Sequence, residues 1–205
     1  IILSVKPQSF EAVAADVADA VTADHLFISI MAGKSTARIA AALNASAAVR
    51  VVRVMPNLPI RVGAGMAGIC KGAAANQEDV ADVRAIFNAG GGSVVLDDES
   101  LMDVVTAVSG SGPAYFYYFV EAMIEGGKAC GLSEADALEL ARFTCLGAGR
   151  MMVETGEPPA ELRARVTSKG GTTHAALESM RRAGVDQAIR DAVLAAFQRG
   201  RELGE

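Results

Sequence analysis

The spacing of apolar residues divides the chain into a first part in which strands and helices alternate and a second part that is entirely helical. Short apolar runs predict buried strands at residues 1–5, 26–30, 49–55 and 93–96, and a glycine-rich segment at 63–70 can pair as a further strand. Apolar residues at helical spacing predict helices over 10–21, 35–43 and 77–89. This alternation is typical of an open α/β sheet with ligand-binding loops at the strand ends.

From residue 98 onward the pattern predicts only helices, so we expect a domain boundary between residues 97 and 98. The expected helices span 100–108, 114–130, 134–154, 160–166, 175–182 and 185–203. The helix at 114–130 has an apolar stripe that is wider than one helix can bury against one neighbour, which indicates a core helix at a subunit interface rather than a cofactor-binding segment. The stripe consists of Tyr115, Phe119 and Met123, with Phe116, Val120 and Ile124 beside it.

Composition and charge narrow the classes of partner. The 205 residues include 19 basic and 24 acidic side chains and no basic cluster, so we expect no nucleic-acid partner. The longest apolar runs are far shorter than the ~20 residues that span a bilayer, so we expect no membrane segment. The three cysteines are scattered and form no metal-binding pair, which is typical of a reducing compartment and favours the cytoplasm.

The first residues of the chain indicate that a segment precedes them. The chain begins with Ile-Ile-Leu-Ser-Val, without a methionine and already inside a predicted strand. Because a protein rarely starts in the middle of a strand, we expect that N-terminal strands of the sheet are missing from this sequence.

The segment from Val166 to Leu177 is the strongest candidate for a binding site. Gly170 and Gly171 lie where a loop becomes a helix, with hydroxyl residues on both sides. The first amides of a helix have no partner within the helix, so they can bind a carboxylate or a phosphate. The alternative is an ordinary cap by Thr172 or Thr173 on a helix that starts near residue 175, and for the segment taken alone this alternative is favoured because capped helices are common.

The remaining residues provide few groups for direct catalysis. The two histidines, His25 and His174, are far apart in the sequence, and no metal-ligand cluster is present, so we expect no metal site. No nucleophile elbow is present, and the acidic run 97–99 is more typical of a solvated turn than of a hydrolytic pair. We therefore expect a bound cofactor to carry the reaction while the protein positions the substrate.

Four motifs in register identify a resemblance to a known family. They are Val-Thr-Ser-x-Gly-Gly-Thr-Thr at 166–173, Ser-Gly-Ser-Gly-Pro-Ala-Tyr at 109–115, Val-Lys-Pro-Gln at 5–8 and Arg-Val-Met-Pro-Asn at 53–57. Their order and spacing resemble those of pyrroline-5-carboxylate reductases along essentially the whole chain. Members of this family reduce 1-pyrroline-5-carboxylate to proline with NADPH or NADH, in the last step of proline biosynthesis.

The resemblance implies a fold and an assembly. Residues 1–97 would be the C-terminal part of a Rossmann-type dinucleotide-binding domain, and residues 98–205 would be an all-α dimerisation and substrate domain. Relatives assemble as homodimers, often further into rings of dimers, with a decamer as the larger assembly. The Gly-rich phosphate turn of the family is absent, and the glycines at 90–92 do not replace it because they end a helix rather than open one.

The resemblance also implies the roles of individual residues. Thr173 is the expected catalytic residue, because its hydroxyl matches the group beside the ring nitrogen of the substrate. The expected substrate-binding residues are Ser168, Gly170, Gly171, Thr172 and Thr173, together with Glu99, Ser109 and Ser111 nearer the edge of the pocket. The expected cofactor-binding residues are Ser4, Val5, Lys6, Pro7, Ile30, Met31, Ala32, Asn57 and Thr106.

One departure from the family pattern and two alternative functions accompany this interpretation. Many relatives carry proline where Lys169 stands, and this lysine is expected to point to solvent.

The first alternative function is that of a non-catalytic fragment that keeps the oligomerising helices but lacks the cofactor phosphate site. The second is a dehydrogenase of similar design that acts on a hydroxy acid, but such enzymes place a catalytic lysine on the long helix, whereas Lys128 lies near its far end.

Overall fold

The computed structural model describes residues 1–44 and 48–204. It contains two compact units, one formed by residues 1–113 with the C-terminal residues from 193, and the other by residues 114–192. The first unit contains all the described strands, and the second is helical throughout.

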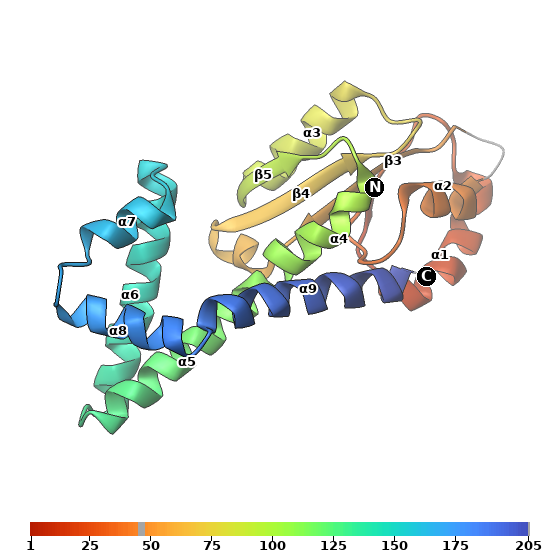
Figure 1. Ribbon diagram of the computed structural model, residues 1–205. Helices are drawn as coiled ribbons and strands as arrows, with labels where there is room; N and C mark the ends of the chain where they lie inside the picture. The colour runs from red at the N-terminus through yellow and green to blue at the C-terminus, as the bar shows by residue number, and fades with distance from the viewer. Residues whose placement is uncertain (45–47, 205) are drawn as a thin grey trace. The chain divides into compact units, whose positions relative to one another are not determined.

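The first unit is built on a five-stranded sheet whose strands lie side by side in sequence order (Figure 1). The strands are β1 (Ile2–Leu3), β2 (Leu26–Ser29), β3 (Arg50–Pro56), β4 (Gly65–Lys71) and β5 (Gly91–Val95). Neighbouring strands are parallel except β3 and β4, which are antiparallel. The expectation of an α/β sheet is therefore confirmed, including the glycine-rich fourth strand. Strand β1 is shorter than expected because the chain turns into a 3-10 helix, η1 (Pro7–Ser9).

Helices cover both faces of the sheet, since alternate residues of β3 belong to two different hydrophobic clusters. Val51 packs in a cluster with α1 (Phe10–Val17) and α2 (Thr36–Asn44). Val52 and Val54 belong to a second cluster with α3 (Gln77–Asn88). Successive side chains of a strand point to opposite faces, so α1 and α2 lie on one face and α3 on the other.

The segment that connects the sheet to the long helix α5 (Gly112–Ala129) differs from the expectation. The sequence predicted a helix that ends at residue 108 and a break over 109–113, but the chain stays helical through η4 (Glu99–Leu101), α4 (Met102–Val105) and a π-helical segment η5 (Thr106–Gly110). The predicted break is wrong, because Gly110 lies within the π-helical segment and not in a turn. A Cβ at this position would lie 2.7 Å from Cε of Met55.

The second unit contains α6 (Glu134–Thr155), α7 (Pro159–Arg165) and α8 (Thr172–Arg182), together with most of α5 and the start of α9 (Val185–Gly204). Ser133 caps α6, since its Oγ accepts a hydrogen bond of 3.1 Å from the amide of Asp136. Within residues 114–192, all of which are described, only Ala137 and Ala141 are fully buried. This unit therefore lacks an apolar core of its own.

The change from strands to helices falls between the end of β5 at Val95 and the start of η4 at Glu99. The compact units divide later, after Pro113, so the domain boundary expected at residue 97 stays a prediction. Among the described residues, no helix has both the length and the apolar character needed to cross a bilayer.

The C-terminal end of α9 contacts the loop after β2, and glycine is required at that contact. Gly33 has φ +71°, and a Cβ there would lie 2.9 Å from the backbone oxygen of Leu203. Gly63 has the same φ, but a Cβ there would meet nothing within 4 Å. The two glycines therefore have the same φ and differ in their surroundings.

We predict that Gly33→Ala lowers the free energy of unfolding more than Gly63→Ala does. Both variants place a side chain in the left-handed region, which costs about 1–2 kcal/mol. Gly33→Ala also forces the backbone of α9 away, which adds about 1–3 kcal/mol. Urea unfolding of both variants measures the difference, and equal losses would contradict the contact between Gly33 and α9.

Candidate functional site

The loops expected to contact a cofactor follow three neighbouring strands. Residues 4–7 follow β1, residues 30–32 follow β2, and Asn57 follows β3. Strands β1, β2 and β3 are parallel and adjacent, so their carboxyl ends meet at one edge of the sheet. The structure therefore brings these expected cofactor residues together at the edge where open α/β sheets bind ligands.

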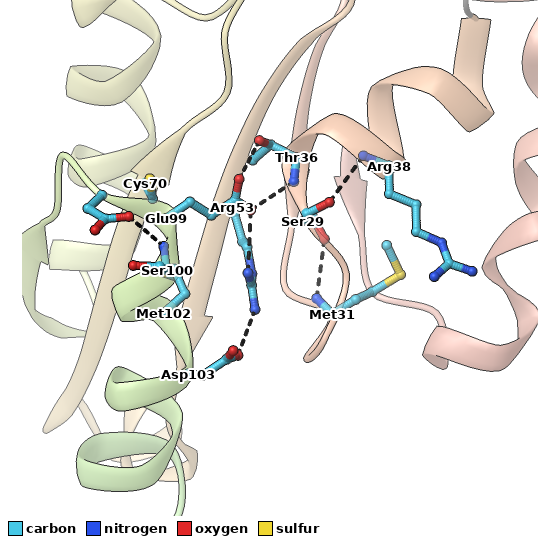
Figure 2. Close-up of polar contacts among 12 residues, drawn as sticks. Ser29, Met31, Thr36, Arg38, Arg53, Cys70, Glu99, Ser100, Met102 and Asp103 are labelled. Carbon is cyan, nitrogen blue, oxygen red and sulfur yellow. Dashed lines mark hydrogen bonds and ion pairs between the residues drawn. The ribbon is translucent and has the colours of Figure 1, made fainter. Parts of the chain in front are cut away.

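A cluster of buried and half-buried polar side chains lies beside the loop after β2 (Figure 2). The carboxylate of Glu99 accepts hydrogen bonds from the amide of Thr36 at 2.8 Å and from its hydroxyl at 2.7 Å. Arg53 is 6% exposed and lies between two carboxylates, with nitrogen–oxygen distances of 3.4 Å to Glu99 and 3.5 Å to Asp103. Both oxygens of Glu99 therefore have partners within the chain.

The neighbouring thiol of Cys70 belongs to the same environment. Its pKa is raised, first by burial and then by the negative charge of Glu99. Cys70 pairs with Arg53 across β3 and β4, so the two side chains lie on the same face of the sheet. A raised pKa keeps this thiol neutral around pH 7, and it acts as a small packing group beside the polar cluster.

Sequence reasoning did not find the role of Arg53, Thr36 and Asp103. In the sequence, Arg53 is part of a motif, and Thr36 and Asp103 fall within predicted helices without any assigned contact. The available signal was a charged residue inside the apolar run of β3, because a buried charge requires a partner of opposite sign. The partner is 46 residues away in sequence, which spacing could not indicate.

Asn57 and Ser109, expected as a cofactor residue and a substrate residue, contact each other directly. The side-chain nitrogen of Asn57 donates to the carbonyl oxygen and the hydroxyl of Ser109 at 3.2 and 3.3 Å. Its side-chain oxygen accepts from the amide of Met66 at 2.9 Å. The amide group of Asn57 therefore links the end of β3 and the start of β4 to the π-helical segment η5.

The residues around Ser109 form the wide turn of η5. The amide of Ser111 donates to the carbonyl oxygen of Thr106 at 2.8 Å, five residues back, as in a π-helix. The hydroxyl of Thr106 donates to the carbonyl oxygen of Met102 at 2.9 Å. π-Helical turns are frequent at functional sites, and this one places Thr106, Ser109 and Ser111 near the strand edge that carries Asn57.

The glycine-threonine segment lies in the second unit and starts α8. The N-cap of α8 is Gly171, in extended conformation, and no side chain caps it. The alternative in which Thr172 or Thr173 caps the helix is therefore wrong, because both residues already lie inside its first turn. Gly170 has φ +74°, and a Cβ on Gly171 would collide with Oγ of Ser168, so both glycines are required by the turn.

The first amides of α8 are available to a ligand. Within the described residues, no acceptor is found for the amides of Thr172, Thr173 and His174. The positive end of the helix dipole and three unpaired N–H groups favour a small anion at this position. Ser168 is exposed and Thr173 is half-buried.

Other candidate groups have ordinary surface roles. Lys128 pairs with Glu125 at 2.9 Å, and this hydrogen bond raises the pKa of the lysine. Lys169 and His174 are exposed. In residues 1–44 and 48–204, no group of three histidine, cysteine or acidic side chains has the arrangement of a metal site.

Comparison with known proteins then identifies the family. A family model described as pyrroline-5-carboxylate reductase dimerisation matches residues 99–203. A pyrroline-5-carboxylate reductase of Methanosarcina acetivorans is 42% identical over 205 residues, which cover all of this chain and 75% of the relative. This chain belongs to the pyrroline-5-carboxylate reductase family. A member from Arabidopsis thaliana is 37% identical and matches all of the chain over 73% of its own length.

Solved structures of the pyrroline-5-carboxylate reductase family have the same fold. The enzyme from Coxiella burnetii superposes with a TM-score of 0.93 at 33% identity, over the whole chain and 75% of the relative. The enzyme from Plasmodium falciparum, solved with NADP bound, superposes with a TM-score of 0.88 at 31% identity over the whole chain and 77% of the relative. The expected fold class, a Rossmann-type sheet followed by helices for dimerisation, is confirmed.

We predict that Asn57→Asp destabilises the protein by about 2 kcal/mol. The substitution replaces the donating nitrogen by an oxygen that faces the carbonyl oxygen of Ser109, so a hydrogen bond becomes a repulsion. Asn88→Asp is the matched control, because Asn88 only accepts a hydrogen bond there, from the hydroxyl of Ser93. Urea unfolding of both variants gives the measurement, and an equal change in the two would contradict the role of Asn57.

Proposed function

We propose that this chain is part of an NAD(P)H-dependent reductase that converts 1-pyrroline-5-carboxylate to proline. The observation that carries the proposal is the uncapped start of α8, whose unpaired N–H groups suit the negative charge of the substrate carboxylate. The amides of Thr172, Thr173 and His174 would donate to the carboxylate oxygens, and the hydroxyl of Ser168 lies beside them. Family membership supports the same substrate.

The residues of the first unit fit the nicotinamide end of the cofactor. Residues 4–7 and 30–32 follow adjacent parallel strands, and Lys6 and Ala32 are exposed at that edge. Open α/β sheets bind dinucleotides at the carboxyl ends of their parallel strands, where these loops lie. When bound, the reduced cofactor supplies the hydride that reduces the C=N bond of the substrate. The NADP seen in the Plasmodium falciparum relative favours NADPH over NADH.

Thr173 would orient the substrate rather than protonate it. A hydroxyl is a poor proton donor, so the ring nitrogen is expected to arrive already protonated as an iminium. The nitrogen would then donate its N–H to Oγ of Thr173, while the carboxylate lies at the start of α8. Two contacts on opposite sides of one carbon fix the face of the ring that receives the hydride.

The alternative of a hydroxy-acid dehydrogenase has less support. It requires a lysine or histidine close to the reacting carbon, but Lys128 pairs with Glu125 on an exposed helix surface. The alternative of a non-catalytic fragment predicts that the helical unit assembles while the protein oxidises no NADPH. An activity measurement on the purified protein therefore separates the fragment from the reductase.

We predict that the purified protein oxidises NADPH only when 1-pyrroline-5-carboxylate is present, and that Thr173→Ala lowers kcat about 10- to 100-fold. The loss reflects misplacement of the ring, so Thr173→Ser restores most of the turnover. Ser179→Ala is the matched control, because it removes a hydroxyl from the exposed part of the same helix. Unchanged turnover in Thr173→Ala would contradict the proposed role of Thr173. If the purified protein has an intact mass of 21.1 kDa and does not oxidise NADPH, the alternative of a non-catalytic fragment is favoured.

We also propose that the second unit forms a homodimer through α5 and α6. Only two alanines of this unit are fully buried, whereas large apolar side chains on both helices are exposed. Those exposed to more than half include Phe116, Tyr117, Tyr118, Leu140, Phe143, Leu146 and Val153. An exposed apolar surface of this kind needs a partner, and the family model names dimerisation for this region. A larger ring of dimers and a cytoplasmic location stay predictions.

We predict that Phe143→Glu shifts the protein from dimer to monomer at micromolar concentration. A buried, unpaired carboxylate at an interface costs several kcal/mol, which weakens association by at least about 100-fold. The control is Ile86→Glu on α3, where the side chain is 50% exposed and lies on the first unit. Sedimentation of both variants measures their mass, and a dimer that survives Phe143→Glu would contradict the proposed interface.

A further inference from the structure

The loop from Ile30 to Ser35 connects the buried strand β2 to helix α2, and side chains contact it at both ends. At its start, the buried hydroxyl of Ser29 accepts a hydrogen bond of 3.3 Å from the amide of Met31. At its end, Ser35 Oγ accepts from the amide of Arg38 at 3.2 Å and caps the first turn of α2. These two contacts are local in sequence.

The contact between Thr36 and Glu99 is different, because Glu99 lies 63 residues later in the chain. Its carboxylate accepts from both the amide and the hydroxyl of Thr36, at the positive end of the α2 dipole. Thr36 is 5% exposed and the side chain of Glu99 is 26% exposed, so these hydrogen bonds are only partly accessible to water. Figure 2 shows the carboxylate between Thr36 and the guanidinium of Arg53.

The surroundings of Thr36 leave it little freedom to move. A Cβ on Gly72, in the loop after β4, would lie 2.9 Å from Cβ of Thr36, so the chain approaches this side chain closely. Arg53 fixes the position of Glu99 through its charge, and Asp103 contacts the other nitrogen of the guanidinium. The first residue of α2 is therefore fixed by groups from β3 and from the segment after β5.

We propose that Glu99 is a positioning residue for the loop at 30–35, and that it acts on cofactor binding through Thr36 rather than by contacting the substrate. Both carboxylate oxygens of Glu99 accept hydrogen bonds within the chain, as its partners Thr36 and Arg53 show. The proposal rests on the proposed function in one respect, which is that the loop at 30–32 contacts the cofactor. Glu99 was expected to contact the substrate. Under the proposal it instead positions the loop that contacts the cofactor, and it does so through Thr36.

Thr36→Val tests the proposal with the least change in shape. Valine keeps the size of the side chain and the backbone amide, but it removes the hydroxyl that donates to Glu99. Thr36→Ser keeps the hydroxyl and serves as the rescue variant. Asp98→Asn is the control, because Asp98 lies in the same turn and caps Ser100, and asparagine keeps that cap while it removes one negative charge.

The first readout is cleavage by trypsin after Lys34, identified by the mass of the fragment 1–34. The side chain of Lys34 is 12% exposed and pairs with Glu11, so cleavage requires the loop to open. Loss of a hydrogen bond to a charged group makes that opening about ten-fold more frequent. We expect cleavage about ten-fold faster in Thr36→Val than in the original protein, and near the original rate in Thr36→Ser and Asp98→Asn.

The second readout is the NADPH concentration that protects the loop from cleavage by half. A loop released at one end spends part of its time in conformations that do not fit a ligand, so the apparent affinity falls with the competent fraction. We expect this concentration to rise roughly three-fold or more in Thr36→Val and to stay unchanged in Asp98→Asn. This readout needs no turnover, so a protein that binds NADPH but does not reduce 1-pyrroline-5-carboxylate would refute the proposed function and leave this proposal standing.

Three outcomes would overturn the proposal. Cleavage of Thr36→Val at the original rate would mean that the hydrogen bond to Glu99 does not restrain the loop. Faster cleavage with an unchanged NADPH requirement would mean that Thr36 only stabilises α2. If NADPH does not protect the original protein at all, then the loop does not contact this cofactor.

Discussion

The buried guanidinium of Arg53 is the interaction on which the arrangement of the first unit depends. It lies on the central strand β3, and the two carboxylates that face it come from the segment after β5 and from α4. Removing one partner of such a pair leaves a buried charge and costs about 3–5 kcal/mol. Because one of these carboxylates also accepts hydrogen bonds at the start of α2, a single charge fixes three separate segments against the same face of the sheet.

The elements that could be predicted from the sequence are those whose signal is local. The strands and α3 follow from runs and spacings of a few residues, and the structure places them within a few residues of the expected bounds. The π-helical segment η5 could not be predicted, because Gly110 and its neighbours read as a turn when the strand they approach is unknown. The antiparallel pairing of β3 with β4 also depends on contacts that hydrophobic spacing does not encode.

Part of the candidate site could likewise be predicted from local patterns in the sequence, and the rest depends on contacts between residues far apart in the chain. The loops at 4–7 and 30–32 could be placed together in advance, because parallel strands bring their carboxyl ends to one edge. The contacts of Glu99 with Thr36 and of Asn57 with Ser109 could not, since they join residues 63 and 52 positions apart. The apolar stripe of α5 could be predicted from the sequence, because it has more apolar positions than one helix can bury against one neighbour. Part of the stripe is exposed in the second unit for the same reason.

The starts of the helices give the clearest physical reason for a ligand at α8. Helix α3 begins with a capping box at Asn76, and α6 begins with the hydroxyl of Ser133, so side chains satisfy their first amides. The first amide of α2 is satisfied by Glu99, which amounts to a carboxylate bound at a helix start. Helix α8 has two threonines in its first turn and no side-chain cap. At the start of α2, the chain itself provides the carboxylate that accepts from the first amide. At the start of α8, the carboxylate of a substrate would take that place.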